Sequence, residues 1–212
     1  MGGKGMKVSL DLHDFSVLNN RLDLLLKIKE HFPNFKVSLF TIPYDYQTEK
    51  NIEGRTLRSK TLEAIKENLE WMQIIPHGLT HMPREFENCD KETFRLALAS
   101  IDEAFKKDGL PYEKGFCAPY WLWNQDVVDV LNERGWWGAI DRRQAEMIRP
   151  NKFYTYSHSL DDPYWKANVD TIKLHGHIDG TSPNDLDRCF TGIFKLPSDT
   201  EWVFVTDFIE EK

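Results

Sequence analysis

The stretch Gln73-Ile74-Ile75-Pro76-His77-Gly78-Leu79-Thr80-His81 runs from a short apolar segment directly into two histidines spaced four residues apart. We predict a strand over residues 73–76 that delivers the first imidazole at its carboxyl end. If the chain turns into a helix there, both imidazoles lie on one helical face and reach a single metal ion. A catalytic zinc ion takes three ligands from the protein, so the rest of the chain should supply a third.

The same pattern, a short apolar segment that ends in polar residues, recurs along the chain. We expect strands over residues 8–12, 36–42, 73–76, 115–118, 137–141, 153–157, 171–175 and 202–206. Helical periodicity predicts helices over residues 17–32, 57–71, 90–109, 124–135 and 183–190, with Ser16, Asp90 and Asn124 as N-caps. Strands that alternate with helices indicate a parallel sheet covered by helices. The predicted fold class is therefore α/β, a distorted (β/α) barrel of seven or eight strands, with one domain over residues 1–212.

The composition favours a small or neutral partner. Lys and Arg number 27 against 34 Asp and Glu, which gives a net charge of −7, and the sequence contains no basic run. This balance argues against non-specific binding to nucleic acid or to an anionic membrane. Aromatic residues make up 13 % of the chain and include seven Trp. Clustered aromatic residues line sugar-binding sites as well as hydrophobic cores.

The cysteine pattern indicates a reducing compartment. Cys89, Cys117 and Cys189 are odd in number and have no metal-ligand spacing, so we expect no disulfide framework. The amino-terminal residues include no apolar signal segment, and no stretch is long and apolar enough to cross a bilayer. We expect a cytoplasmic protein, although a secreted form with its signal removed would have the same sequence.

Four segments, taken in order, carry a resemblance to a known family. They are His13-Asp14, His77-Gly78-Leu79-Thr80-His81, Phe116-Cys117-Ala118-Pro119-Tyr120-Trp121 and Leu174-His175. This series resembles the motifs of polysaccharide deacetylases, the carbohydrate esterase family with NodB homology. It is more similar to a divergent branch whose first motif is His-Asp. The similarity extends from about residue 7 to residue 207.

The resemblance implies that Asp14, His77 and His81 bind one divalent metal ion. The residue types agree, because one carboxylate and two imidazoles suit Zn²⁺, and Co²⁺, Ni²⁺ or Mn²⁺ are acceptable alternatives. In such a site the metal lowers the pKa of a bound water and polarises the carbonyl of an N-acetyl group.

The resemblance also implies the groups around the metal. The backbone N–H of Tyr120 corresponds to the oxyanion donor, and the ring of Pro119 fixes the turn before it. We expect Trp121 and Trp123 to join Pro119 in binding substrate.

His175 corresponds to the histidine that protonates the leaving amine, a role that suits histidine because the ordinary pKa of an imidazole lies near neutral pH. We expect His177 to face the opposite side, so that only one of the two histidines faces the site. Asp141 corresponds to the aspartate that orients this histidine, and Asp161 and Asp162 compete for that role.

Two residues depart from the common family pattern. His13 stands where the family has an aspartate that acts as the base, and Cys117 stands where the family has an arginine that holds this aspartate. The two changes are compatible, because an arginine would have no carboxylate to hold. We predict that His13 is the general base, or that Asp11, two positions earlier on the same face of the strand, takes this part.

These residues indicate a metal-dependent hydrolase that removes an acyl group, most simply N-acetyl, from an amino sugar or polysaccharide. A second hypothesis keeps the site and changes the substrate to an O-acetyl ester or a non-sugar amide. In that case residues 44–55 and nearby aromatic side chains would shape a pocket that rejects long glycans. Those side chains are Tyr120, Trp121, Trp123, Trp136 and Trp137. A third hypothesis is a carbohydrate-binding protein that has lost catalysis. The oligomeric state is not predicted.

Overall fold

The computed structural model describes residues 5–44, 52–144, 148–163, 169–178 and 185–212. Its larger sheet has six strands in the order β3-β2-β1-β8-β7, with β9 also paired to β1. These strands are β1 (Lys7–Phe15), β2 (Val37–Thr41), β3 (Met72–Pro76), β7 (His158–Ser159), β8 (Thr171–His177) and β9 (Glu201–Val203). Every pairing in this sheet is parallel. This confirms the predicted α/β class with a buried parallel sheet.

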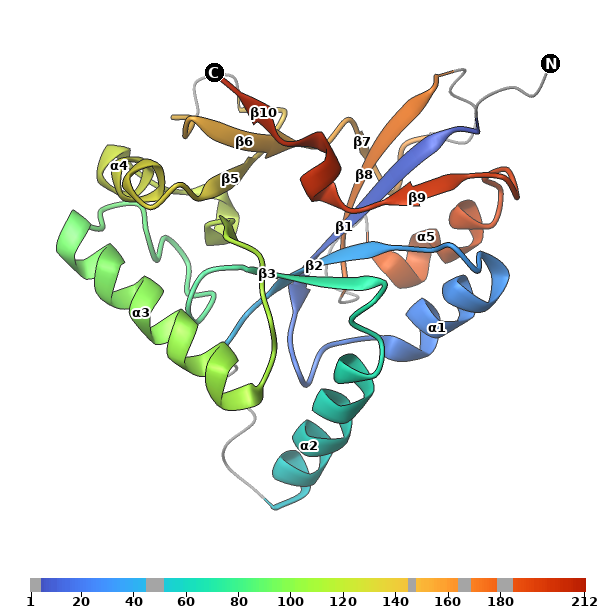
Figure 1. Cartoon of the computed structure of the whole chain (residues 1–212), viewed down its shortest axis with the longest axis horizontal. Coiled ribbons are helices and arrows are strands. Elements are labelled where there is room, and N and C mark those ends of the chain that lie inside the picture. Colours follow the sequence, from blue (N-terminus) through green and yellow to red (C-terminus); the bar gives the residue numbers. More distant parts are fainter. Residues whose placement is uncertain (1–4, 45–51, 145–147, 164–168, 179–184) are drawn as a thin grey trace.

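The smaller sheet has four strands in the order β10-β6-β5-β4. They are β4 (Gly115–Phe116), β5 (Trp137–Ile140), β6 (Lys152–Thr155) and β10 (Glu210–Glu211). The two sheets meet at two seams: a β-bridge joins His77 to Cys117 beside β3 and β4, and the chain passes from β6 directly into β7. Within the described ranges the strands therefore form a distorted barrel of two sheets (Figure 1).

The strand count differs from the predicted seven or eight for two local reasons. The expected strand over residues 153–157 ends early, with β6 at Thr155, and the chain then adds a separate short strand, β7, at His158–Ser159. The expected last strand ends at Val203 because the chain then forms a short 3-10 helix over Val205–Phe208. Residues after that helix add β10, which pairs antiparallel with β6.

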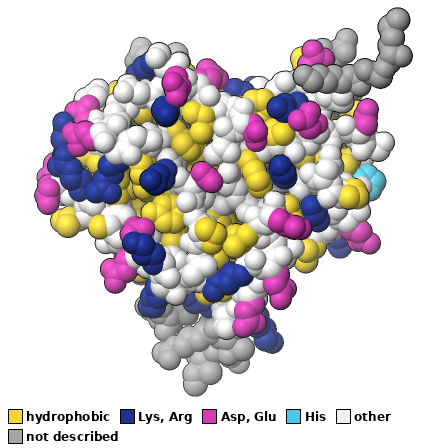
Figure 2. All heavy atoms as spheres, viewed as in Figure 1, with side chains coloured by type: hydrophobic (Ala, Val, Ile, Leu, Met, Phe, Trp, Pro, Cys, Tyr) yellow, Lys and Arg dark blue, Asp and Glu magenta, His cyan; other side chains and the backbone are white. Residues whose placement is uncertain are grey.

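Helices cover the outer side of the strands (Figure 1). They are α1 (Leu22–His31), α2 (Ile52–Lys66), α3 (Lys91–Asp108), α4 (Gln125–Glu133) and α5 (Leu186–Ile193). The predicted caps at Asp90 and Asn124 are confirmed, since their side chains accept hydrogen bonds from the backbone N–H of Thr93 and Val127. On the face seen in Figure 2, charges of both signs are interspersed, and histidine is visible only at the right-hand edge.

Three predicted helices have wrong boundaries. Helix α1 begins at Leu22, and Ser16 instead accepts a hydrogen bond from the backbone N–H of Asn19 in the preceding turn. Helix α2 covers Ile52–Lys66 rather than residues 57–71, and residues 45–51 of the expected loop lie outside the described residues. Helix α5 extends to Ile193, and residues 183–184 of its predicted start also lie outside.

The interior contains two apolar clusters and three buried cysteines. A large apolar cluster lies between the sheet and the helices, and a smaller one, which includes Phe40, Trp137, Tyr154 and Val205, combines residues from both sheets. All three cysteines are buried and none forms a disulfide, as predicted. None of the helices in the described ranges is both long and apolar enough to cross a membrane.

Candidate metal centre and active site

Strand β1 carries two kinds of side chain on its two faces. Val8, Leu10 and Leu12 belong to the large apolar core. The alternate residues are polar, and Ser9, Asp11 and His13 are all at most 1 % exposed. Since successive side chains of a strand point to opposite faces, these polar residues lie inside the barrel. Burying them requires polar partners nearby, and other strands supply them.

Near the carboxyl end of β1, Asp14 lies close to both His77 and His81. Its Oδ1 atom is 3.2 Å from His77 Nε2 and 2.9 Å from His81 Nε2. Burial raises the pKa of the Asp14 carboxyl, but hydrogen bonds with the two imidazoles outweigh burial and hold this pKa well below its ordinary value. The three residues predicted to bind the metal are therefore brought together, with ligand atoms within 4.8 Å of one another.

The loop after His77 is not the helix that would place two histidines on one face. Gly78 and His81 both have left-handed backbone conformations, with φ of 67° and 60°. Glu85 holds the loop by accepting hydrogen bonds from the backbone N–H groups of Leu79 and Thr80 and from the Thr80 hydroxyl. The histidines converge because the loop folds back. Sequence reasoning missed Glu85, because a single acidic residue in a polar segment gives no signal.

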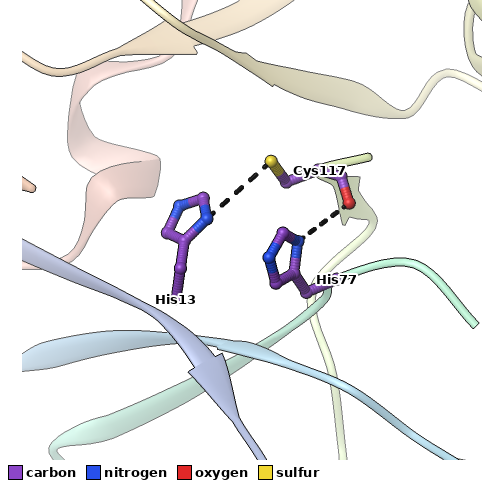
Figure 3. Close-up of side chains that lie close together, drawn as sticks. All are labelled: His13, His77 and Cys117. Carbon is purple, nitrogen blue, oxygen red and sulfur yellow. Dashed lines mark hydrogen bonds between the residues drawn. The ribbon is translucent and has the colours of Figure 1, made fainter. Parts of the chain in front are cut away.

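His77 is fixed from its other side. Its Nδ1 atom lies 3.1 Å from the carbonyl oxygen of Cys117, and this oxygen can only accept a hydrogen bond (Figure 3). Nδ1 therefore carries a proton. Nε2 can donate to the Asp14 carboxylate only when the ring carries a second proton, and in the neutral ring it presents a lone pair there. Two acceptors 3.2 Å apart require a cation or a proton between them. This arrangement fits a divalent metal, and a backbone carbonyl behind a ligating histidine is a usual supporting contact.

His13 lies behind this triad, with 1 % of its surface exposed. Its ring stacks on Phe40 with centroids 4.3 Å apart, and its Nδ1 atom is 4.0 Å from Cys117 Sγ (Figure 3). Burial raises the pKa of the Cys117 thiol, so the thiol keeps its proton and can donate toward Nδ1. Burial, and then the neighbouring His175 and His77, lower the pKa of His13 well below 6.5. His13 is therefore a neutral ring at neutral pH.

The second nitrogen of His13 faces Asp11. Nε2 is 3.4 Å from Asp11 Oδ1, but this contact lacks the geometry of a hydrogen bond, and no other partner for Nε2 lies among the described residues. The nearby carboxylate favours the tautomer with the proton on Nε2. The lone pair of His13 then lies on Nδ1.

Asp11 makes its strongest contact with His175. Asp11 Oδ1 is 2.5 Å from His175 Nδ1, and Asp11 Oδ2 accepts a hydrogen bond of 2.8 Å from the Tyr154 hydroxyl. Tyr156 stacks on the His175 ring with centroids 4.4 Å apart. Neither tyrosine was predicted, because aromatic residues in a strand give the same signal as core residues.

The prediction that His177 faces away from His175 is wrong. Their ring centroids are 5.2 Å apart, and His177 also lies 5.9 Å from His13. Residues two apart in a strand share a face, because side chains alternate with a period of two. Both histidines of β8 therefore line the interior next to β1.

The prediction that Asp141 orients His175 is also wrong. The Asp141 carboxylate accepts hydrogen bonds from the Tyr156 hydroxyl at 2.7 Å and from Arg143 Nε at 3.1 Å. Burial raises the pKa of Asp141, but the hydrogen bonds from Arg143 and Tyr156 lower it overall. Asp141 reaches His175 only through the stacked ring of Tyr156.

The two competing aspartates have local partners instead. Asp162 accepts from the backbone N–H of Ser159 and from Arg142, at 2.8 and 2.9 Å. Asp161 lies 3.8 Å from Arg188. Both are therefore loop residues with surface ion pairs.

The segment after β4 brings two aromatic residues to the site. Tyr120 and Trp121 both have left-handed backbone conformations, with φ of 57° and 61°. Tyr120 is 55 % exposed, and its ring centroid lies 5.6 Å from that of His81. The ring centroid of Trp121 lies 4.9 Å from that of His13 and 5.4 Å from that of His175. Non-glycine residues held in this conformation are strained and gather at functional sites.

The other tryptophans expected to shape a pocket belong to the core. Trp123 is 7 % exposed, and its indole N–H donates to the carbonyl oxygen of Ile148 at 2.8 Å. Trp136 and Trp137 are also buried. The expectation of substrate binding is therefore wrong for Trp123, because its polar atom already has a partner inside the protein.

No family model and no curated relative matches this sequence. Solved structures do match, and their similarity extends over nearly the whole chain. The Bc1960 peptidoglycan N-acetylglucosamine deacetylase has a TM-score of 0.63 at 15 % identity, over 97 % of this chain and 89 % of that one. The structure of T48 deacetylase with substrate has a TM-score of 0.63 at 12 % identity, and the match covers 98 % of this chain and 94 % of that one.

A CE4 family pseudoenzyme from Bacillus anthracis, BA3943, has a TM-score of 0.59 at 12 % identity. The match covers 96 % of this chain but only 65 % of the pseudoenzyme chain, so the present sequence spans less than two thirds of that relative. At 12–15 % identity these likenesses establish architecture. The chain has the fold of the CE4 deacetylases, as the resemblance of its motifs predicted.

Proposed function

We propose that this protein is a metal-dependent hydrolase that removes an acyl group, most simply N-acetyl, from an amino sugar or a polysaccharide. The observation that carries this proposal is the pair of facing acceptors, His77 Nε2 and Asp14 Oδ1, with His77 Nδ1 engaged on the carbonyl of Cys117. A divalent cation held by Asp14, His77 and His81 satisfies this arrangement. The shared fold with deacetylases supports the reaction class.

Zn²⁺ suits this ligand set best, and Co²⁺, Ni²⁺ or Mn²⁺ could replace it. When bound, such an ion acidifies water and polarises the carbonyl of the substrate. Two neutral imidazoles and one carboxylate leave a net positive charge on the site, which favours the negative charge that develops on the carbonyl oxygen. The backbone N–H of Tyr120 is proposed as the second donor to that oxygen.

His13 is the proposed base. It is neutral, and its Nδ1 atom holds the lone pair when Asp11 favours a proton on Nε2. Among the described residues, this lone pair has only the thiol of Cys117, a weak donor, at 4.0 Å. The alternative base, Asp11, is less suitable because both of its oxygen atoms are already engaged, by His175 and by Tyr154. His175 is the proposed acid, and it delivers its proton to the leaving amine. Trp121, beside both histidines, is proposed to contact the substrate.

The proposal is tested by metal content and acetate release. We expect about one equivalent of zinc by elemental analysis, and release of acetate from N-acetylglucosamine oligomers that a chelator abolishes and zinc restores. His77→Ala and His81→Ala should each abolish both properties. His31→Ala, at the exposed end of α1, is the control and should retain both. Failure to take up any of the four metals on titration would refute the proposal.

A binding protein without catalysis is the second candidate. The observation that favours it is the burial of His13 at 1 % exposure, in the place where the family has a carboxylate base. One of the similar structures is itself described as a pseudoenzyme. This candidate predicts saturable binding of the same oligomers by calorimetry with no acetate release. The two remaining alternatives are an O-acetyl esterase and a non-sugar amidase. They predict release of acetate from O-acetyl esters or from non-sugar acetamides, and none from the N-acetylglucosamine oligomers.

A further inference from the structure

Asp11 is the most deeply buried carboxylate of the site, and it has three polar neighbours. It is 1 % exposed. Its Oδ1 atom lies 2.5 Å from His175 Nδ1 and 3.4 Å from His13 Nε2, and its Oδ2 atom accepts the Tyr154 hydroxyl at 2.8 Å. A buried carboxylate is costly unless it is paired and hydrogen-bonded. A single carboxylate here lies between both histidines that the proposed reaction uses.

We propose that Asp11 is a positioning residue for His175, and that Tyr154 anchors it. In this chain a carboxylate on β1 thus supports the acid, where Asp141 was expected to do so. This inference rests on the proposed function for the role of His175.

The pairing of two strands sets the geometry of this unit. In the register of β1 against β8, Asp11 is opposite His175 and His13 is opposite His177. The distance between Asp11 and His175 is therefore fixed by backbone hydrogen bonds rather than by a loop. A site on paired strands is held more precisely than a site on loops.

The contact selects one tautomer of His175. A carboxylate accepts a hydrogen bond, so the proton lies on Nδ1, and the reacting nitrogen is Nε2. Without this contact the ring could rotate or take the other tautomer, and the acid would be lost although the histidine remained.

Tyr154 holds the carboxylate from the opposite side. Burial, and then the Asp11 charge, raise the pKa of Tyr154 well above 10, so the hydroxyl keeps its proton and donates it to Asp11 Oδ2. Tyr154 lies on β6 of the smaller sheet, whereas Asp11 lies on β1 of the larger one. The hydrogen bond therefore also joins the two sheets across the interior.

Asp11, His13 and His175 could instead bind a second cation, because their ligand atoms lie within 4.8 Å of one another. The 2.5 Å separation of Asp11 Oδ1 and His175 Nδ1 is that of a short hydrogen bond, and it leaves no space for an ion between them. Metal content distinguishes the two interpretations. The positioning role predicts that Asp11→Asn retains the metal content of the parent protein.

The decisive experiment compares substrates that differ in their leaving group. An amine leaves poorly without a proton, whereas the phenolate of an activated aryl acetate leaves without one. We expect Asp11→Asn to lower kcat on an N-acetyl substrate about 100-fold or more, with a much smaller effect on the aryl ester. Tyr154→Phe, the milder variant, should show the same selectivity with a loss of about tenfold.

A matched pair of controls lies outside the site. Tyr112 donates to Asp102 at 2.9 Å, so Tyr112→Phe and Asp102→Asn make the same chemical changes in another tyrosine–aspartate pair. Both should leave the amide-to-ester ratio unchanged. Equal losses on amide and ester in Asp11→Asn and Tyr154→Phe, or loss of metal in either, would overturn the positioning role.

A second measurement does not depend on turnover. A proton held between an imidazole Nδ1 and a carboxylate at short distance gives a far-downfield proton NMR signal. We expect this signal in the parent protein and in Tyr112→Phe, and its loss in Asp11→Asn and His175→Gln. If no substrate were hydrolysed while the signal behaved in this way, the proposed function would fail and the pairing would stand. Persistence of the signal in Asp11→Asn would refute the pairing itself.

Discussion

Gly78 lies directly against Pro119. A Cβ atom on Gly78 would come within 2.6 Å of Pro119 Cγ and within 2.6 Å of a Glu85 carboxylate oxygen. The loop that carries His81 and the segment that carries Tyr120 are thus in contact through a glycine. The position of one loop depends on the position of the other.

Gly78→Ala is therefore expected to disturb both loops. The left-handed backbone alone costs about 1–2 kcal/mol for a residue with a Cβ atom, and the contact with Pro119 adds to this cost. Gly135→Ala is the matched control, because Gly135 has a φ of 66° and no atom within 4 Å of the added Cβ. Thermal unfolding should show a larger loss for Gly78→Ala, and zinc titration should show weakened binding only in that variant. Equal losses in the two variants would contradict the contact.

Glu85 is expected to control metal affinity without contacting the metal. Glu85→Ala removes the acceptor for two backbone N–H groups and one hydroxyl. Leaving such groups without a partner costs about 1–3 kcal/mol where they are buried, and loss of a supporting contact lowers metal affinity about 10–100-fold. Glu87→Ala, which removes only an ion pair with Arg84 at the surface, should change neither property. Competition with a chromogenic chelator measures the affinity.

His13 predicts how the stability of the metal-free protein changes with pH. Its pKa is depressed in the folded state, so below about pH 6.5 the unfolded chain binds a proton that the folded chain does not. The contribution of His13 to the free energy of unfolding is therefore fully present above this pH. It is lost as pH falls, by up to about 1.4 kcal/mol per pH unit. His13→Asn should flatten this slope in urea unfolding between pH 7 and pH 5, whereas the control His31→Asn should not. An unchanged slope in His13→Asn would show that His13 does not cause the pH dependence of stability.

Alanine substitutions at Trp121 and at Trp123 are expected to affect different properties, turnover for the first and stability for the second. Trp123→Ala creates a cavity and leaves the carbonyl of Ile148 without its donor, so we expect a loss of about 3–5 kcal/mol in the free energy of unfolding. Trp121→Ala should lower turnover with a smaller change in stability, because its ring contacts the site histidines. Urea unfolding and steady-state kinetics on both variants measure the two effects. A normal KM and kcat in Trp121→Ala would remove this residue from the site.

Sequence patterns predicted the fold better than they predicted the contacts in the site. Short apolar segments ending in polar residues located the strands, and the ordered motifs brought Asp14, His77 and His81 together correctly. The contacts from other strands could not be predicted in this way. Tyr154 reaches Asp11 across the interior from β6, and no pattern within one strand indicates which residue of another strand it will meet.

The wrong assignments share a physical cause. Asp141 was expected at the site through the resemblance and Trp123 through its place close after the third motif. Each has a nearer polar partner, Arg143 with Tyr156 for the first and Ile148 for the second. A polar group takes the partner that local folding supplies. The loop after His77 could not be predicted either, because the acceptor that shapes it, Glu85, lies outside the motif.

The alternation along β1 has a consequence for how this protein can change. Leu10 and Leu12 pack against the helices while Asp11 and His13 occupy the interior, so a slip of one residue against β8 would exchange the two sets. An insertion or deletion within this strand would destroy the core and the chemistry in a single event. Substitutions at its interior positions leave the apolar face intact. A point change at an interior position such as His13 can therefore alter the chemistry and keep the core, whereas a change in the length of β1 cannot.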